Sequence, residues 1–216
     1  MCIRDRSLDF VGPFPPSHPD KYVYLFTIKD TFTKWIEAFP VRKANTITVI
    51  HILQEHIFSR FGKCERLHSD QGTQFTSHLF QEVADILKIQ VTFTPAYNPK
   101  SNPVERVHRD LKAGLMALTK DKPNEWVKHL STLLYACRNS ISSGTGFSPF
   151  QLMFGRDPID DLDVMFPSPS RKRELLTNSE FARSLAERIE QAHHWARVNM
   201  GPVSYTHLTL PTIYSV

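Results

Sequence analysis

The sequence contains few cysteines, and they lie far apart. Cys2, Cys64 and Cys137 are the only three, and no Cys-x-x-Cys pair occurs. An odd number at wide spacing supports neither a disulfide framework nor a structural zinc site. We therefore expect reduced cysteines that pack in the interior.

Long hydrophobic runs are also missing. No stretch of about 18 apolar residues occurs, which excludes a transmembrane helix and predicts no membrane partner. Residues 1–6 lack the apolar segment of a signal peptide, which favours an intracellular protein. The chain of 216 residues is 41% hydrophobic and 11% aromatic, which excludes wholly disordered and collagen-like classes. Its net charge of +4 permits nucleic-acid binding without demonstrating it.

Composition divides the chain into a principal domain, a linker and a final helix. We expect the domain at residues 7–158, a linker rich in Pro, Ser and Asp at 159–179, and a charged helix at 180–201. Residues 1–6 and 202–216 do not continue the patterns of their neighbours and resemble translated adapter sequence. We expect both ends to be non-native, and the natural gene product to extend past them.

Hydrophobic periodicity predicts strands and helices in alternation. The predicted strands are a short one around Asp9 and residues 22–28, 34–39, 64–69 and 90–94; the predicted helices are 46–61, 75–87, a segment after Pro103 and a segment after Pro123. The residues expected to face inward include Leu79, Leu118 and, in the final helix, Trp195. This order predicts an α/β fold with a five-stranded mixed sheet flanked by helices, followed by a C-terminal helical extension.

Three acidic residues lie where predicted elements begin or end. Asp9 lies on the short first strand, Asp70 follows a buried strand, and Glu105 lies in the first turn of a helix. A mixed sheet can bring such positions to one edge, where carboxylate oxygens suit Mg²⁺ or Mn²⁺. Divalent cations offset the mutual repulsion of crowded carboxylates, and two metals can bracket a phosphorus. The chemistry implied is phosphodiester cleavage or transfer.

Structural roles also explain these acids, and pattern alone leaves both interpretations open. Asn102, Pro103 and Glu105 form a good helix start, with Glu105 reaching back in a capping box. Asp70 precedes Gln-Gly, a common turn sequence. Asp30 is predicted to be a hairpin-turn residue.

Longer motifs resemble a known family. They run in the family's order from residue 8 to residue 158: LDFVGPFP, YLFTIKDTFTKWIEAFPVR, IFSRFG with HSDQGTQFTSHLF, TPAYNPKSNPVERVHRDLK, and YACRNSISSGTGFSPFQLMFGRDP. Together they resemble the catalytic core of retroviral and gypsy-type LTR retrotransposon integrases. Here 34 residues separate Asp70 from Glu105, one fewer than in the common form of the family's signature.

The resemblance implies a ribonuclease H-like fold with two Mg²⁺ (or Mn²⁺) ions held by Asp9, Asp70 and Glu105. It implies an integrase domain of a retrotransposon Pol polyprotein that trims the 3′ ends of element DNA and joins them to target DNA. Water is the nucleophile in the first step and the DNA 3′-hydroxyl in the second, so no covalent enzyme intermediate is expected. The resemblance also implies a homo-oligomer that acts in the nucleus, and that lies within a retroelement particle before integration.

One helix face combines the third acid with DNA-binding candidates. Glu105, His108, Arg109 and Lys112 follow one another at spacings of three, one and three, opposite the apolar stripe. With the resemblance we expect Lys112, Arg109 and His108 to contact DNA; a solvated helix face is the alternative. Further candidates lie in the preceding loop: Tyr97, Asn98 and Ser101.

Two other functions remain as alternatives. One is a ribonuclease H-like nuclease, and the other is an inactive or host-adopted copy that binds DNA. The family usually has an N-terminal His2Cys2 zinc domain and a C-terminal DNA-binding domain, and neither pattern is present here. We therefore expect this chain alone to perform disintegration or weak strand transfer at best.

Overall fold

The computed structural model describes residues 5–94, 105–159 and 178–201. By its internal contacts the chain forms two compact units, residues 1–138 and 139–216, which are described separately. The expected boundaries at residues 158 and 179 stay a prediction. No helix in the described ranges is long and apolar enough to cross a membrane.

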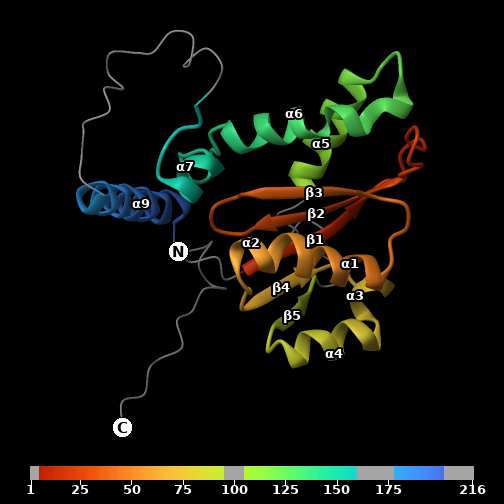
Figure 1. Cartoon of the computed structure of the whole chain (residues 1–216), viewed down its shortest axis with the longest axis horizontal. Helices are drawn as coiled ribbons and strands as arrows, with labels where there is room; N and C mark the ends of the chain where they lie inside the picture. Colours follow the sequence, from red (N-terminus) through yellow and green to blue (C-terminus); the bar gives the residue numbers. More distant parts are fainter. Residues whose placement is uncertain (1–4, 95–104, 160–177, 202–216) are drawn as a thin grey trace. The chain divides into compact units, whose positions relative to one another are not determined.

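A five-stranded mixed sheet forms the centre of the first unit (Figure 1). Its strands are β1 (Asp5–Val11), β2 (Tyr24–Asp30), β3 (Ile36–Val41), β4 (Arg66–Ser69) and β5 (Gln90–Phe93). Their spatial order is β3-β2-β1-β4-β5; the first three pair antiparallel, and β4 and β5 continue in parallel from β1. The predicted sheet is confirmed. Asp5 and Arg6, expected in a non-native end, lie within β1.

Helices from the middle of the chain cover one face of this sheet. They are α1 (Thr46–Ile52), a π-helical segment η1 (Leu53–Phe58), α2 (Ser59–Phe61), α3 (Thr73–Thr76) and α4 (His78–Ile86). The first three form the predicted helix 46–61, which ends at Gly62. The φ of Gly62 is +75°, a backbone conformation that would be strained in a residue with a side chain. The expected inward position of Leu79 is wrong. Ser77 starts a new helix there, so Phe80 and Ala84, four residues apart, face the sheet, and Leu79 is exposed.

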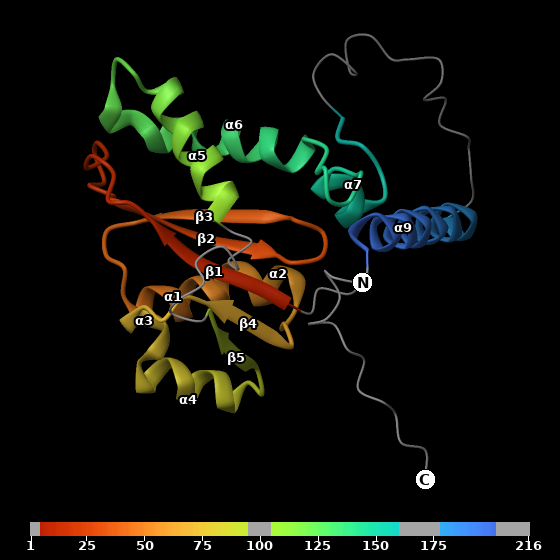
Figure 2. The same cartoon turned by 180° about the vertical axis from the view of Figure 1, so that it is seen from behind.

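Two longer helices cover the opposite face (Figure 2). They are α5 (Glu105–Leu118) and α6 (Trp126–Asn139), joined through the short 3₁₀ turn η3 (Pro123–Glu125). Leu111 and Leu115 of α5 pack with Trp126 of α6 against the sheet. The expectation for Leu118 is wrong, because the buried row continues four residues on to Thr119, whose hydroxyl donates to the Leu115 carbonyl.

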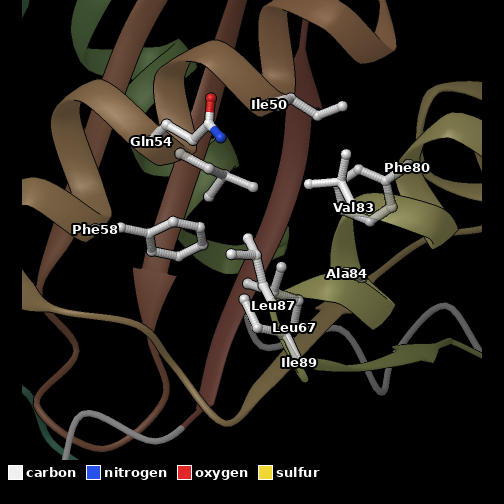
Figure 3. A pocket seen from close by; sticks show the side chains of 10 residues that line it. Ile50, Gln54, Phe58, Leu67, Phe80, Val83, Ala84, Leu87 and Ile89 are labelled. Carbon is white, nitrogen blue, oxygen red and sulfur yellow. The ribbon is translucent and has the colours of Figure 1, made fainter.

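A small apolar cavity lies under the first set of helices. Ile50 of α1 and Phe58 of η1 face Phe80 and Val83 of α4 across it (Figure 3), and Leu53 also lines it. No carboxylate lines it, so it offers nothing to a metal ion or a phosphate. The polar residues of interest lie on the other face of the sheet.

The second unit contains α7 (Pro149–Phe154) and α9 (Asn178–Met200). Gly155 ends α7 against Leu185 and Ile189 of α9. His193 is buried, and its Nε2–H donates to the carbonyl of Leu152 at 2.8 Å. The expected inward position of Trp195 is wrong: this side chain is 56% exposed, because the face of α9 that packs on α7 runs through His193 and Ala196.

Candidate active site

The pleat of the sheet places two of the three acids on one face. Leu8 of β1 and Leu67 of β4 are buried in the core under α1 and α4. Because side chains alternate along a strand, Asp9 and, beyond the end of β4, Asp70 point to the opposite face, the one that α5 covers. The strand register pairs Ser7 with His68, and two further residues along both strands bring Asp9 level with Asp70.

Asp9 lies inside β1, and each of its carboxylate oxygens has a nitrogen nearby. The backbone N–H of Phe10 donates to Oδ1 at 2.7 Å. The imidazole Nδ1 of His108, on α5, lies 3.3 Å from Oδ2. The carboxylate is 17% exposed, so helix and sheet almost enclose it.

Asp70 directly follows β4 and begins a turn, as the turn interpretation predicts. The N–H of Gly72 donates to its Oδ1 at 3.0 Å. This turn uses one carboxylate oxygen, so it leaves the other able to bind a ligand. A turn residue and a metal ligand are therefore compatible roles for Asp70. Asp30 has the predicted turn role. It is buried, and both the N–H and the hydroxyl of Thr33 donate to its Oδ1.

Polar side chains of β4 and β5 support the turn at Asp70. The His68 ring contacts the hydroxyls of Thr92 in β5 and of Thr94 just after it, with Nδ1 3.0 Å from Thr92 Oγ1 and Nε2 3.1 Å from Thr94 Oγ1. The Thr94 hydroxyl lies 3.3 Å from the Ser69 carbonyl, next to Asp70. These contacts fix the end of β4 from which Asp70 projects. These contacts were not predicted from the sequence. The available signal was a histidine, His68, near the end of the predicted strand 64–69.

Glu105 is the first residue of α5, but its side chain lies outside the described residues, as do Asn102 and Pro103. Whether Glu105 forms a capping box is thus not tested. The helix itself gives its position: His108, one turn later on the same face, contacts Asp9. The first turn of α5 therefore lies over the acids of the sheet. Among side chains in the described ranges, no group of three or more metal-ligating residues occurs.

His108 is held in a largely buried setting. Its side chain is 13% exposed, and its Nε2 lies 2.6 Å from the hydroxyl of Thr27 on β2. Burial, and secondarily the charge of Lys29, lowers the pKa of His108 to about 4. The ring is therefore neutral at pH 7. Its single proton can lie on Nδ1 and face Asp9 when the Thr27 hydroxyl donates its one proton to Nε2 rather than to the Asp9 carbonyl, which is 3.1 Å away.

Comparison with known proteins identifies this arrangement. Residues 6–99 match the profile of the integrase core domain family. The chain is 32% identical over 182 residues to the Pro-Pol polyprotein of simian foamy virus type 1, covering 82% of this chain and 15% of the polyprotein. The chain carries an integrase catalytic core. It thus spans a small fraction of the curated relatives that it matches.

Solved structures agree with the fold of this integrase core. The catalytic core domain of BIV integrase is 27% identical, with a TM-score of 0.53, and the match covers 69% of this chain and 93% of that one. The HTLV-2 integrase catalytic core domain, a trimeric form in complex with magnesium, has a TM-score of 0.55 at 20% identity, covering 69% of this chain and 95% of that one. The ribonuclease H-like fold class is therefore confirmed.

The donor set of the integrase core fits a hard divalent cation. Asp9 and Asp70 offer carboxylate oxygens, which Mg²⁺ and Mn²⁺ prefer. Each oxygen of a carboxylate has two lone pairs, so the hydrogen bonds to Asp9 leave capacity for a metal. The Cys64 thiol does not compete, because it packs in the core under α1 and α4 and burial raises its pKa to about 11.

The predicted DNA-binding residues fall into three groups. Arg109 and Lys112 are exposed on α5 beside the acids, as phosphate contacts would require. His108 contacts Asp9 and Thr27, a position that the sequence did not predict. The loop candidates Tyr97, Asn98 and Ser101 lie outside the described residues. All of these DNA contacts stay predictions.

Proposed function

We propose that this chain is the integrase catalytic domain of a retrotransposon Pol polyprotein, which carries out Mg²⁺-dependent 3′-end processing of element DNA and its strand transfer into target DNA. The observation that carries the proposal is the parallel register of β1 and β4, which pairs Ser7 with His68 and so brings Asp9 and Asp70 to the same end of the sheet, together with the contact of Asp9 with His108 in the first turn of the helix that begins at Glu105. The match to the integrase core domain supports the same reaction class.

In this proposal the acids hold the metal and the basic residues hold the DNA. Asp9, Asp70 and Glu105 would bind two Mg²⁺ ions, which supply activation of the attacking oxygen and stabilisation of the leaving oxygen. Arg109 and Lys112, one and two turns along α5 from Glu105, would bind phosphates next to the scissile bond. Water attacks in the first step and the 3′-hydroxyl in the second, so no side chain acts as a nucleophile.

We extend the proposal to partners and location. The partners are element DNA ends, target DNA and further copies of this chain, and the site of action is the nucleus. The trimeric, magnesium-bound form of the HTLV-2 core supports oligomerisation and metal use in general. The net charge of +4 is consistent with a DNA partner.

Disintegration, the reversal of strand transfer, tests the proposed function directly. With a labelled branched oligonucleotide and Mg²⁺, the unaltered chain should release the joined strand. Glu105→Gln removes a charged metal ligand at constant shape and should lower the rate by about 10²–10³-fold or more. Folding should be unchanged by circular dichroism and denaturant unfolding.

The control is Glu55→Gln, the same exchange at an exposed position on the other face of the sheet, which should keep full activity. Disintegration that persists at the unaltered rate in Glu105→Gln contradicts the proposal. Cleavage without any joining in the unaltered chain would favour the nuclease alternative instead. DNA binding with neither reaction would favour an inactive, host-adopted copy.

Lys112→Ala should weaken DNA binding and reduce its salt dependence. Loss of one phosphate contact should lower the slope of log K against log[salt] by about one. Fluorescence anisotropy with labelled duplex at several KCl concentrations measures this slope. Lys63→Ala is the matched control, because Lys63 is exposed near the start of β4, at the opposite end from Asp70. Equal slopes for both variants would exclude Lys112 as a phosphate contact.

A further inference from the structure

His108 lies where the packing of α5 changes from apolar to polar. One turn further along the helix, Leu111 and Leu115 are fully buried in the core against the sheet. One turn earlier the helix begins at Glu105. The described contacts between the first turns of α5 and the sheet therefore include one polar attachment at His108.

This attachment has two points on two strands. Nδ1 lies 3.3 Å from Asp9 Oδ2 on β1, and Nε2 lies 2.6 Å from Thr27 Oγ1 on β2. Asp9 and Thr27 are direct partners in the antiparallel register of these strands. Thr27 is fully buried, and its hydroxyl is also 3.1 Å from the Asp9 carbonyl. A planar ring that is held at both nitrogens cannot rotate or slide without breaking a hydrogen bond.

We propose that His108 is a positioning residue: together with Thr27 it orients the Asp9 carboxylate and fixes the helix turn that carries Glu105 over it. This inference rests on the proposed function of the acids. Glu105 is three residues before His108, about 4.5 Å along the helix axis and on the same face. A shift of His108 therefore moves Glu105 relative to Asp9. Partners that orient metal ligands commonly change metal affinity by about 10–100-fold when they are removed.

The charges around His108 favour positioning over phosphate binding. The groups that face it are the Asp9 carboxylate, the Thr27 hydroxyl and the buried Lys29. Both ring nitrogens already have protein partners, so a phosphate would have to displace one of them. The exposed side chains of Arg109 and Lys112 remain the better DNA contacts on this helix.

Mg²⁺ binding without DNA tests the proposal. Isothermal titration calorimetry of the intact chain with MgCl₂ should give an affinity about tenfold weaker for His108→Ala than for the unaltered chain. His108→Asn should recover most of the loss, because its amide nitrogen can occupy the position of Nδ1 and donate to Asp9. Thr27→Val, which keeps the shape but removes the hydroxyl, should weaken Mg²⁺ binding in the same direction and serves if His108→Ala does not fold.

Three further measurements separate the possible roles. His51→Ala, at an exposed position on α1, is the control and should not change Mg²⁺ affinity. Metal-free DNA affinity and its salt slope should stay the same in His108→Ala; a shallower slope would identify a phosphate contact and overturn the proposal. Unchanged Mg²⁺ affinity in both His108→Ala and Thr27→Val would overturn it as well. The proposed function fails separately, if Asp9→Asn still binds Mg²⁺ like the unaltered chain.

Discussion

Asp9→Asn and Asp70→Asn should each abolish Mg²⁺-dependent DNA joining and the stabilisation of the fold by Mg²⁺. Each exchange keeps a side-chain oxygen that can accept the local backbone N–H, from Phe10 or from Gly72. The local structure should therefore persist. What is lost is one negative charge in a pair of adjacent carboxylates, and with it the attraction for a divalent cation. We expect a fall in the joining rate of about 10³-fold.

Unfolding with and without metal distinguishes this loss from a loss of structure. At a Mg²⁺ concentration ten times the Kd, the unaltered chain should gain about 1.4 kcal/mol in its free energy of unfolding. The two variants should gain nothing. Without metal Asp70→Asn should be as stable as the unaltered chain or more stable, because a repulsion between like charges is removed. Asp9→Asn should be slightly less stable, because its amide nitrogen cannot accept from His108 Nδ1. Asp85→Asn, on the exposed side of α4, controls for the exchange itself. A variant that keeps its Mg²⁺-dependent gain would show that the carboxylates do not bind the metal.

The adjacency of these two acids could be anticipated only in part from the sequence. Alternating apolar residues predict the strands, and Leu8 and Leu67 predict which face of each strand is buried. Neither pattern gives the pairing of β1 with β4, which are joined across residues 12–65, a segment that contains two further strands and a long helix. The register that brings Asp9 level with Asp70 is a property of the assembled sheet. The family resemblance supplied what the local patterns lack.

Helix faces were predicted less well than helix positions. An apolar stripe on a helix can continue at a spacing of three or of four residues. After Leu115 these spacings lead to Leu118 and Thr119, and in the structure Thr119 is the buried one. The predicted inward position of Leu79 was wrong because a new helix begins after its N-cap Ser77. His108 was predicted as a DNA contact because it shares a helix face with Arg109 and Lys112. Its burial depends on Thr27, a polar residue within an otherwise apolar strand, and that pairing is not local.

Glu37→Ala should destabilise the first unit by about 2–3 kcal/mol, because it leaves the partly buried Arg138, whose side chain is 21% exposed, without its anionic partner. Glu37 is 7% exposed on β3. Its Oε2 accepts from the Arg138 guanidinium at 2.6 Å, and its Oε1 accepts from Trp35 Nε1 at 3.0 Å and from Arg60 at 3.3 Å. Burial lowers the pKa of Arg138, and the charge of Glu37 opposes this effect. Removing Glu37 therefore leaves a cation that is costly to keep and cannot readily lose its proton.

Denaturant unfolding measures the loss, and three variants locate its origin. Glu82→Ala breaks an exposed pair with His78 on α4 and should change stability by less than about 0.5 kcal/mol. Arg138→Met with Glu37→Leu removes both charges and should be less destabilised than Glu37→Ala alone. A loss below about 1 kcal/mol in Glu37→Ala would contradict the assignment.

Arg138 also protects an edge of the sheet. Among the strands of the described ranges β3 is an edge strand that pairs with β2, and the Nε–H of Arg138 donates to the outward carbonyl of Ile36 at 2.9 Å. An edge strand with unpaired carbonyls can pair with another chain. The double variant should therefore recover stability but associate more readily than Glu37→Ala, in which Arg138 still covers the edge. Light scattering measures this self-association, at denaturant concentrations where the two variants are equally stable. It separates the role of Arg138 in the ion pair with Glu37 from its role in covering the edge strand.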